Sequence, residues 1–76
     1  MSYGYSSRLI AMNKRASKTK LGVALGRKCI ALDIPVVEVA ARLGVSRMTV
    51  YNWFAGTHEP QRLYASAINT LLNSLQ

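Results

Sequence analysis

Two short apolar segments joined by a single glycine constrain this chain more than any other feature. They lie in the stretch VVEVAARLGVSRMTVYNWFAG. An apolar stripe at helical spacing precedes Gly44: Val36, Val39, Ala40 and Leu43. Gly44 supplies the left-handed backbone that ends a helix, and Ser46 is a good N-cap for the next one. The pattern predicts helices over 36–43 and 46–55 with a tight turn between them.

Apolar residues at helical spacing also flank this pair. Leu21, Leu25 and Leu32 predict a helix over 18–32, with Ser17 as its N-cap. A second apolar stripe predicts a last helix over 60–75: Leu63, Ala67, Ile68, Leu71, Leu72 and Leu75. No segment has the alternation of a strand, so the predicted fold class is all-α, a compact bundle of four to five helices.

Two glycines lie inside the helix predicted over 18–32. Gly22 and Gly26 each cost about 1 kcal/mol relative to alanine in a helix interior. We therefore expect a neighbouring helix to approach closely at this point and to offset that cost.

The first residues differ in composition from the rest. Residues 1–17 begin with Ser, Gly and Tyr and then carry Arg8, Lys14 and Arg15. The sequence therefore predicts a basic, flexible N-terminal arm over 1–17 and a helical domain over 18–76. The brief apolar patch over 9–12 leaves open whether part of the arm docks on the domain or forms a short helix.

The charge of the chain is strongly one-sided. Ten Lys and Arg stand against three Asp and Glu, a formal net charge of +7, and no acid precedes Asp33. Such a charge favours a polyanionic partner, either nucleic acid or an anionic membrane surface. The apolar stretches are far shorter than the roughly 20 residues that span a bilayer, so we expect no membrane-spanning helix and no membrane partner.

The sequence offers no constellation typical of catalysis or metal binding. Cys29 is the only cysteine, which excludes an internal disulfide, fits a reducing cytoplasm and indicates a small core residue. His58 lacks the partners of a metal site or a catalytic triad. The three acids are scattered, so we expect no enzyme activity, no cofactor, no metal and no small-molecule ligand.

The spacing Ala40-x3-Gly44-x-Ser46-x3-Val50-x2-Trp53-x2-Gly56-x3-Pro60 resembles the Cro/lambda-repressor (XRE-type) family of helix-turn-helix domains. The resemblance covers most of the chain, about residues 21–72. It implies a lambda-repressor-like fold, double-stranded DNA as partner and a homodimer on DNA, with helix 46–55 entering the major groove. Two positions depart from the family pattern. Val36 replaces a frequent glutamine that braces the recognition helix, and Phe54 replaces a frequent acidic residue.

The resemblance also implies which side chains meet DNA. With Val50 and Trp53 anchored in the core, the predicted base-reading residues are Arg47, Met48, Tyr51 and Asn52. Arginine can pair with guanine and asparagine with adenine, while the other two can pack on a thymine methyl group or a sugar. Predicted contacts to the phosphate backbone are Ser46, Thr49, Thr57, Lys14, Arg15, Lys18 and Lys20. The alternative is that both sets are solvated surface residues.

Three functions agree with these features. The first is a sequence-specific transcription regulator, a small phage or bacterial repressor that occupies an operator in the cytoplasm of a bacterial host, associated with the nucleoid. The second is a DNA-bending recombination accessory protein, similar to an excisionase. The third is a protein-binding antitoxin or inhibitor module, against which the excess of positive charge argues weakly.

Overall fold

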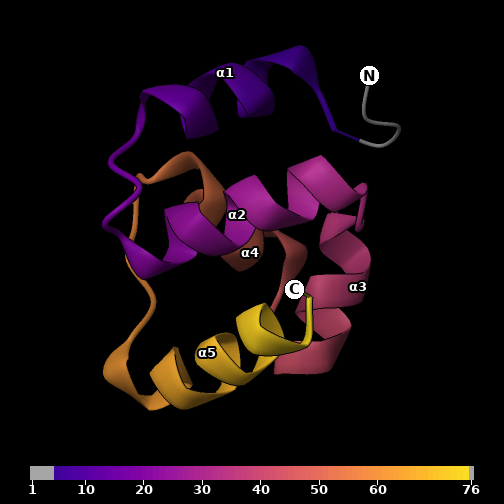
Figure 1. The fold of residues 1–76 in the computed structure, drawn as a ribbon, viewed down its shortest axis with the longest axis vertical. Coiled ribbons are helices and arrows are strands. Elements are labelled where there is room, and N and C mark those ends of the chain that lie inside the picture. The colour runs from indigo at the N-terminus through magenta and orange to yellow at the C-terminus, as the bar shows by residue number, and fades with distance from the viewer. Residues whose placement is uncertain (1–4, 76) are drawn as a thin grey trace.

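The structure is a computed structural model and describes residues 5–75. Over these residues, five α-helices and one 3-10 helix follow one another (Figure 1). They are α1 (Ser7–Arg15), α2 (Leu21–Leu32), α3 (Val36–Leu43), α4 (Arg47–Ala55), η1 (Arg62–Tyr64) and α5 (Ala65–Ser74). No strand occurs over residues 5–75. The expected all-α fold class is confirmed.

Helices α2 and α4 form the centre of the molecule. In Figure 1, α2 lies in front of α4, with α1 above it and α5 below it. The core between these helices contains Leu25, Val50 and Ile68, each with 0% of its surface exposed. Helices α2 and α4 make the most extensive contact of any helix pair described. This contact fixes the position of α4, the second helix of the predicted helix-turn-helix.

The expected close approach at the two glycines of α2 is confirmed. A Cβ atom on Gly22 would lie 2.8 Å from the Cβ atom of Trp53. One on Gly26 would lie 2.6 Å from Cγ of Phe54 and 2.8 Å from Nδ2 of Asn13. Because real Cβ atoms do not approach so closely, only glycine lets α2 pack against α4 at this distance.

The start of α2 differs from the prediction. The helix begins at Leu21 and not at residue 18, and its N-cap, Lys20, makes no side-chain capping bond. Ser17 instead forms a hydrogen bond between its Oγ and Oγ1 of Thr19, at 2.7 Å. The local serine–threonine contact thus holds a turn before the helix, and Ser17 does not cap it.

The expectation of a flexible arm is wrong for residues 7–15, which form α1. Ser6 caps this helix by accepting a hydrogen bond from the backbone N–H of Leu9, at 3.1 Å. Leu9 and Asn13 are both only 2% exposed. The apolar patch therefore docks on the domain as a helix. Residues 1–4 of the expected arm lie outside the described residues.

A buried side-chain amide attaches α1 to the two central helices. Nδ2 of Asn13 donates to the backbone carbonyl of Val23 at 3.2 Å and to that of Phe54 at 2.8 Å. Buried polar groups are stable only when they are paired, and here both donors are used. This single residue joins α1, α2 and α4.

The last helix is shorter than predicted. The segment after residue 60 first forms η1, and α5 begins only at Ala65. Tyr64 packs against Trp53 with the ring centroids 5.5 Å apart, whereas Leu63 is 71% exposed. Leu63 therefore does not belong to the buried stripe, and the tyrosine covers the core in its place.

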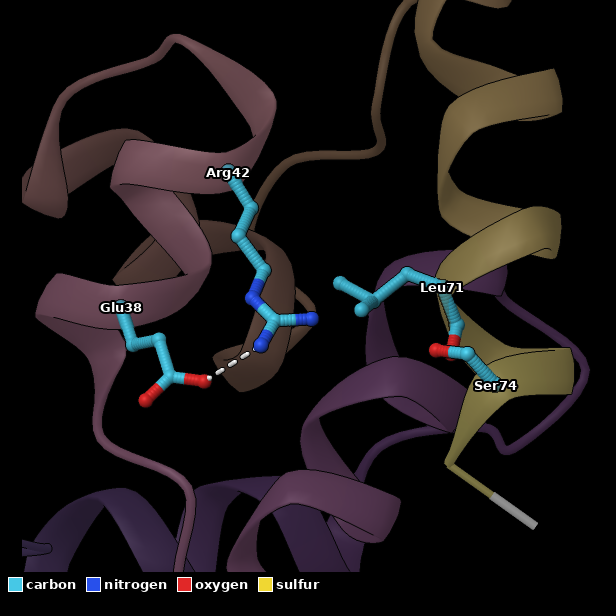
Figure 2. Close-up of polar contacts among 4 residues, drawn as sticks. All are labelled: Glu38, Arg42, Leu71 and Ser74. Carbon is cyan, nitrogen blue, oxygen red and sulfur yellow. Dashed lines mark hydrogen bonds and ion pairs between the residues drawn. The ribbon is translucent and has the colours of Figure 1, made fainter.

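Helix α3 lies beside the C-terminal part of α5. Figure 2 shows Arg42 of α3 pointing towards Leu71 of α5. The guanidinium of Arg42 forms an ion pair with Oε2 of Glu38, at 3.1 Å. Oγ of Ser74 donates to the carbonyl of Leu71 at 2.7 Å. Both groups of the ion pair are exposed, so the pair contributes little to stability.

Candidate nucleic-acid interface

Helices α3 and α4 and the turn between them have the geometry that the sequence predicts. Gly44 follows α3 in the left-handed conformation, with φ of 69°, and its N–H donates to the carbonyl of Ala40. Ser46 then caps α4 by accepting a hydrogen bond from the N–H of Thr49 at 3.1 Å. The glycine turns the chain and the serine starts the next helix, which sets α4 across α3.

One side of α4 is held in the core. Val50, Trp53 and Phe54 are 0%, 4% and 0% exposed. The phenylalanine at the position where the family often has an acid packs on Gly26 and stacks against Tyr5, with ring centroids 6.3 Å apart. These anchors leave the opposite side of α4 facing away from α2.

The four predicted base-reading residues lie on the other sides of α4. Met48 is 67% exposed, Arg47 is exposed, and Tyr51 and Asn52 are half-buried. Oδ1 of Asn52 accepts a hydrogen bond from Oγ1 of Thr57 at 3.3 Å. This bond uses one lone pair of the amide oxygen and leaves its other lone pair and both amide hydrogens for a base.

Helix α1 contributes to the surface beside α4, which the sequence did not predict. A groove next to the first turns of α4 is lined by Ser6, Leu9, Val36, Arg47, Met48 and Tyr51. Its walls come from the starts of α1 and α3. The sequence does contain a signal for the start of this helix. Ser6 is a good N-cap, and the apolar Leu9 follows it three residues later.

The predicted backbone contacts do not form one surface. Ser46 and Thr49 lie at the start of α4, in a hollow that also includes His58 and Gln61. Their hydroxyl oxygens are 2.9 Å apart. Thr57 lies beyond the other end of α4 and donates to Asn52. The hydroxyl groups thus border both ends of the helix.

The four predicted basic contacts divide between two regions. Arg15 and Lys20 lie near the end of α4, in a hollow that includes Gly56. Nζ of Lys20 donates to the carbonyl of Gly56 at 3.2 Å, so this cation stabilises the C-terminal end of α4. Lys14 lines a groove between α1 and α2, and Lys18 lines a groove between α2 and α5.

Two buried groups keep their protons at neutral pH. Burial, followed by the charge of Glu38, raises the pKa of the Cys29 thiol to about 11. Burial also raises the pKa of Tyr5, whose hydroxyl donates to the backbone carbonyl of Ile34. A protonated, fully buried thiol is chemically inert, in agreement with a core role for Cys29.

Residues 5–75 contain no group of three or more His, Cys, Asp or Glu side chains placed to hold a metal ion. No helix in the same range is long and apolar enough to cross a membrane.

The fold and the exposed side of α4 define a helix-turn-helix domain, a class that binds DNA. Residues 16–63 match the homeodomain-like domain family, and the chain belongs to that family. No curated protein and no solved structure matches the chain. The family match covers α2, α3 and α4 and leaves out α1 and α5.

Proposed function

We propose that this protein is a sequence-specific DNA-binding transcription regulator, a small phage or bacterial repressor that acts by occupying its operator. The observation that carries this proposal is the division of α4 into a buried side and a free side. Val50 and Trp53 are buried, while Arg47 and Met48 beside them are exposed. A helix held in this way after a tight turn can enter the major groove.

Within this proposal the free side of α4 reads bases. Arg47 donates two hydrogen bonds to guanine, and Asn52 pairs with adenine. Met48, which is 67% exposed, packs on a thymine methyl group. Tyr51, half-buried beside Leu9 in the groove, contacts the sugar edge.

The backbone contacts that the structure supports are those close to α4. Ser46, Thr49 and Thr57 border the helix, and Arg15 lies near its end. Hydroxyl groups and arginine commonly hold phosphates and fix the register of a protein on the duplex. Lys20 has an internal partner at Gly56, so we propose for it a role in holding α4.

We further propose that the protein binds as a homodimer in the manner of Cro/lambda-repressor domains. The spacing from Ala40 to Pro60 supports this narrower assignment, because it follows the pattern of that group. Two copies related by a two-fold axis would read half-sites about 10 base pairs apart, one turn of the duplex.

Selection of bound duplexes from a random library tests the proposal. We expect an enriched motif with two inverted half-sites, because two copies of α4 would read the same bases in opposite directions. A motif without symmetry would contradict the dimer. Recovery of unselected sequences, together with strong bending in a gel-shift assay, would replace the repressor by a DNA-bending protein.

A further inference from the structure

The outer side of α2 is a surface that the DNA-binding motif does not use. The buried residues of α2 include Gly22, Gly26 and Cys29. Successive residues of an α-helix turn by about 100°, so a second set points the opposite way: Ala24, Arg27, Lys28 and Ala31. In Figure 1 this side lies towards the viewer, with α4 behind α2.

Two grooves run along this side of α2 and merge. The first lies between α1 and α2 and is lined by Ile10, Asn13, Lys14, Arg27, Ile30 and Ala31. The second lies between α2 and α5 and is lined by Lys18, Ala24, Arg27, Lys28, Ala31 and Leu72. Because they share Arg27 and Ala31, they form one surface, named here the α2 face.

The α2 face combines an apolar floor with a basic rim. Its apolar lining residues are Ile10, Ala24, Ile30, Ala31 and Leu72. Four cations surround them, Lys14, Lys18, Arg27 and Lys28, and no Asp or Glu lines either groove. This arrangement is complementary to a ligand that is apolar on one side and acidic around it.

Arg27 is held in place by the end of α1. Its Nη2 donates to the backbone carbonyl of Asn13 at 3.0 Å and to that of Lys14 at 3.4 Å. The guanidinium therefore stays at the boundary between the two grooves, where an arriving carboxylate meets a charge that is already positioned.

The walls of the α2 face come from the parts of the chain outside the family match. The match covers residues 16–63, whereas α1 ends at Arg15 and α5 begins at Ala65. The homeodomain-like core alone would leave α2 without either groove, so the surface is specific to a chain that has both additional helices.

We propose that the α2 face binds an acidic amphipathic helix of a partner protein. The small side chains of Ala24 and Ala31 let a helix approach α2 closely, and its apolar side fills the two grooves. Its carboxylates then lie beside Lys14, Lys18 and Lys28. The face is opposite α4, so partner and DNA are held at the same time.

Two other occupants fit less well. A second copy of this chain carries a net charge of +7 and only three acids, so it would bring like charge to a basic rim. A DNA duplex would gain from the cations but not from the apolar floor, because its phosphate backbone is polar and fully hydrated.

The test uses two synthetic fluorescent peptides of identical composition, made of Leu, Ala and Glu. In the first the leucines form one helical stripe at i, i+3, i+4 and i+7, and in the second they are scattered. Fluorescence anisotropy at physiological salt measures binding to the whole protein. We expect the striped peptide to bind at least about fivefold more tightly, since only it can place apolar side chains in the grooves.

Variants then locate the binding site. Lys28→Glu reverses a charge on the α2 face, and Arg62→Glu makes the same change on η1, where Arg62 is exposed. We expect Lys28→Glu to weaken the striped peptide about fivefold and Arg62→Glu to change binding less than about twofold. Ala31→Gln tests the apolar floor without a charge, with Ala41→Gln on the exposed side of α3 as its control.

Equal binding of the two peptides would show that net charge alone attracts them and would overturn the proposal. Equal effects within each pair of variants would overturn it as well. If duplex DNA displaced the striped peptide and Lys28→Glu weakened DNA binding as much as Arg47→Ala, the face would be a second nucleic-acid site. Peptide binding that survives in Arg47→Ala separates this proposal from the proposed DNA reading.

Discussion

Only a few side chains of α4 are exposed, so the proposed recognition of DNA depends on each of them. Val50 and Trp53 could be placed inside from the sequence, because residues at i and i+3 share a side of a helix. That placement also left Arg47 and Met48 on the outside, where the structure has them. The hydrogen bond from Thr57 to Asn52 could not be predicted, because it depends on how the chain turns after Gly56.

Arg47→Ala is expected to reduce discrimination at one base pair and to leave the fold intact. A bidentate pair between arginine and guanine is worth about 1–3 kcal/mol of discrimination, and the side chain is exposed. Binding measured against every single-base variant of the selected site checks the result. Arg42→Ala, on the exposed side of α3, is the control, and a uniform loss over all sites would contradict base reading by Arg47.

Cys29→Ala is expected to flatten the dependence of stability on alkaline pH. The folded thiol has a pKa of about 11 against an ordinary value of 9.0. Its protonated form is thus favoured by folding, so its contribution is complete below about pH 9 and is lost as the pH rises towards about 11. Urea unfolding at about pH 8 and about pH 10 should show a larger loss for the original protein. Equal losses in the two proteins would contradict a thiol pKa that folding raises.

At the scale of elements, the sequence predicts best the helices whose ends are set by neighbouring capping residues. Gly44, Ser46 and Gly56 set the ends of α3 and α4, and the structure agrees within a residue. The prediction is wrong for α1, because a nine-residue helix is unstable alone and depends on contacts with distant residues. Two of these contacts are carbonyls of α2 and α4 that Asn13 binds, and no local pattern reveals them.

Gly26→Ala is expected to destabilise the protein although alanine favours helices. The new methyl group would lie 2.6 Å from Cγ of Phe54. Overpacking of this kind costs about 1–3 kcal/mol, more than the roughly 1 kcal/mol gained in helix propensity. Urea unfolding measures the difference.

Gly44→Ala is the comparison for this variant. At Gly44 nothing lies within 4 Å of an added Cβ, and only the positive φ of 69° opposes alanine. It should therefore cost about 1 kcal/mol through backbone strain alone. Stabilisation by Gly26→Ala would show that α2 and α4 can move apart freely.

Asn13→Ala is expected to detach α1. It removes the side-chain amide that donates to the carbonyls of Val23 and Phe54, and the loss of these two bonds costs about 2 kcal/mol. Asn69→Ala, at an exposed position of α5, should change stability far less. Hydrogen exchange should show faster exchange in α1 for the first variant only, and equal exchange in both variants would contradict the role of the amide.

At the scale of the whole molecule, the positive charge is divided between two sides. Lys14, Lys18 and Lys28 line the α2 face, whereas Arg15 and Arg47 lie near α4. Composition and charge could predict a polyanionic partner. They could not predict which cations lie on which side, because that depends on how α1 and α5 pack against α2. Half of the predicted basic contacts, Lys14 and Lys18, therefore lie away from α4.

The salt dependence of DNA binding should reveal this division. Each lysine or arginine that neutralises a phosphate adds close to one to the slope of log affinity against log salt. Arg15→Ala should lower that slope by about 0.9, whereas Lys18→Ala should leave it unchanged. Titrations at several salt concentrations on one fixed duplex measure both. A lower slope for Lys18→Ala would place the duplex on the α2 side.

The amide of Asn13 has a consequence for how binding preferences can change. Through the carbonyl of Phe54, it attaches the C-terminal end of α4 to α1, which carries none of the four proposed base-reading residues. A small shift of that attachment would tilt the helix and alter which bases its side chains reach. If α4 reads an operator as proposed, genetic screens for altered operator choice should recover changes at position 13 along with changes among the proposed base-reading residues.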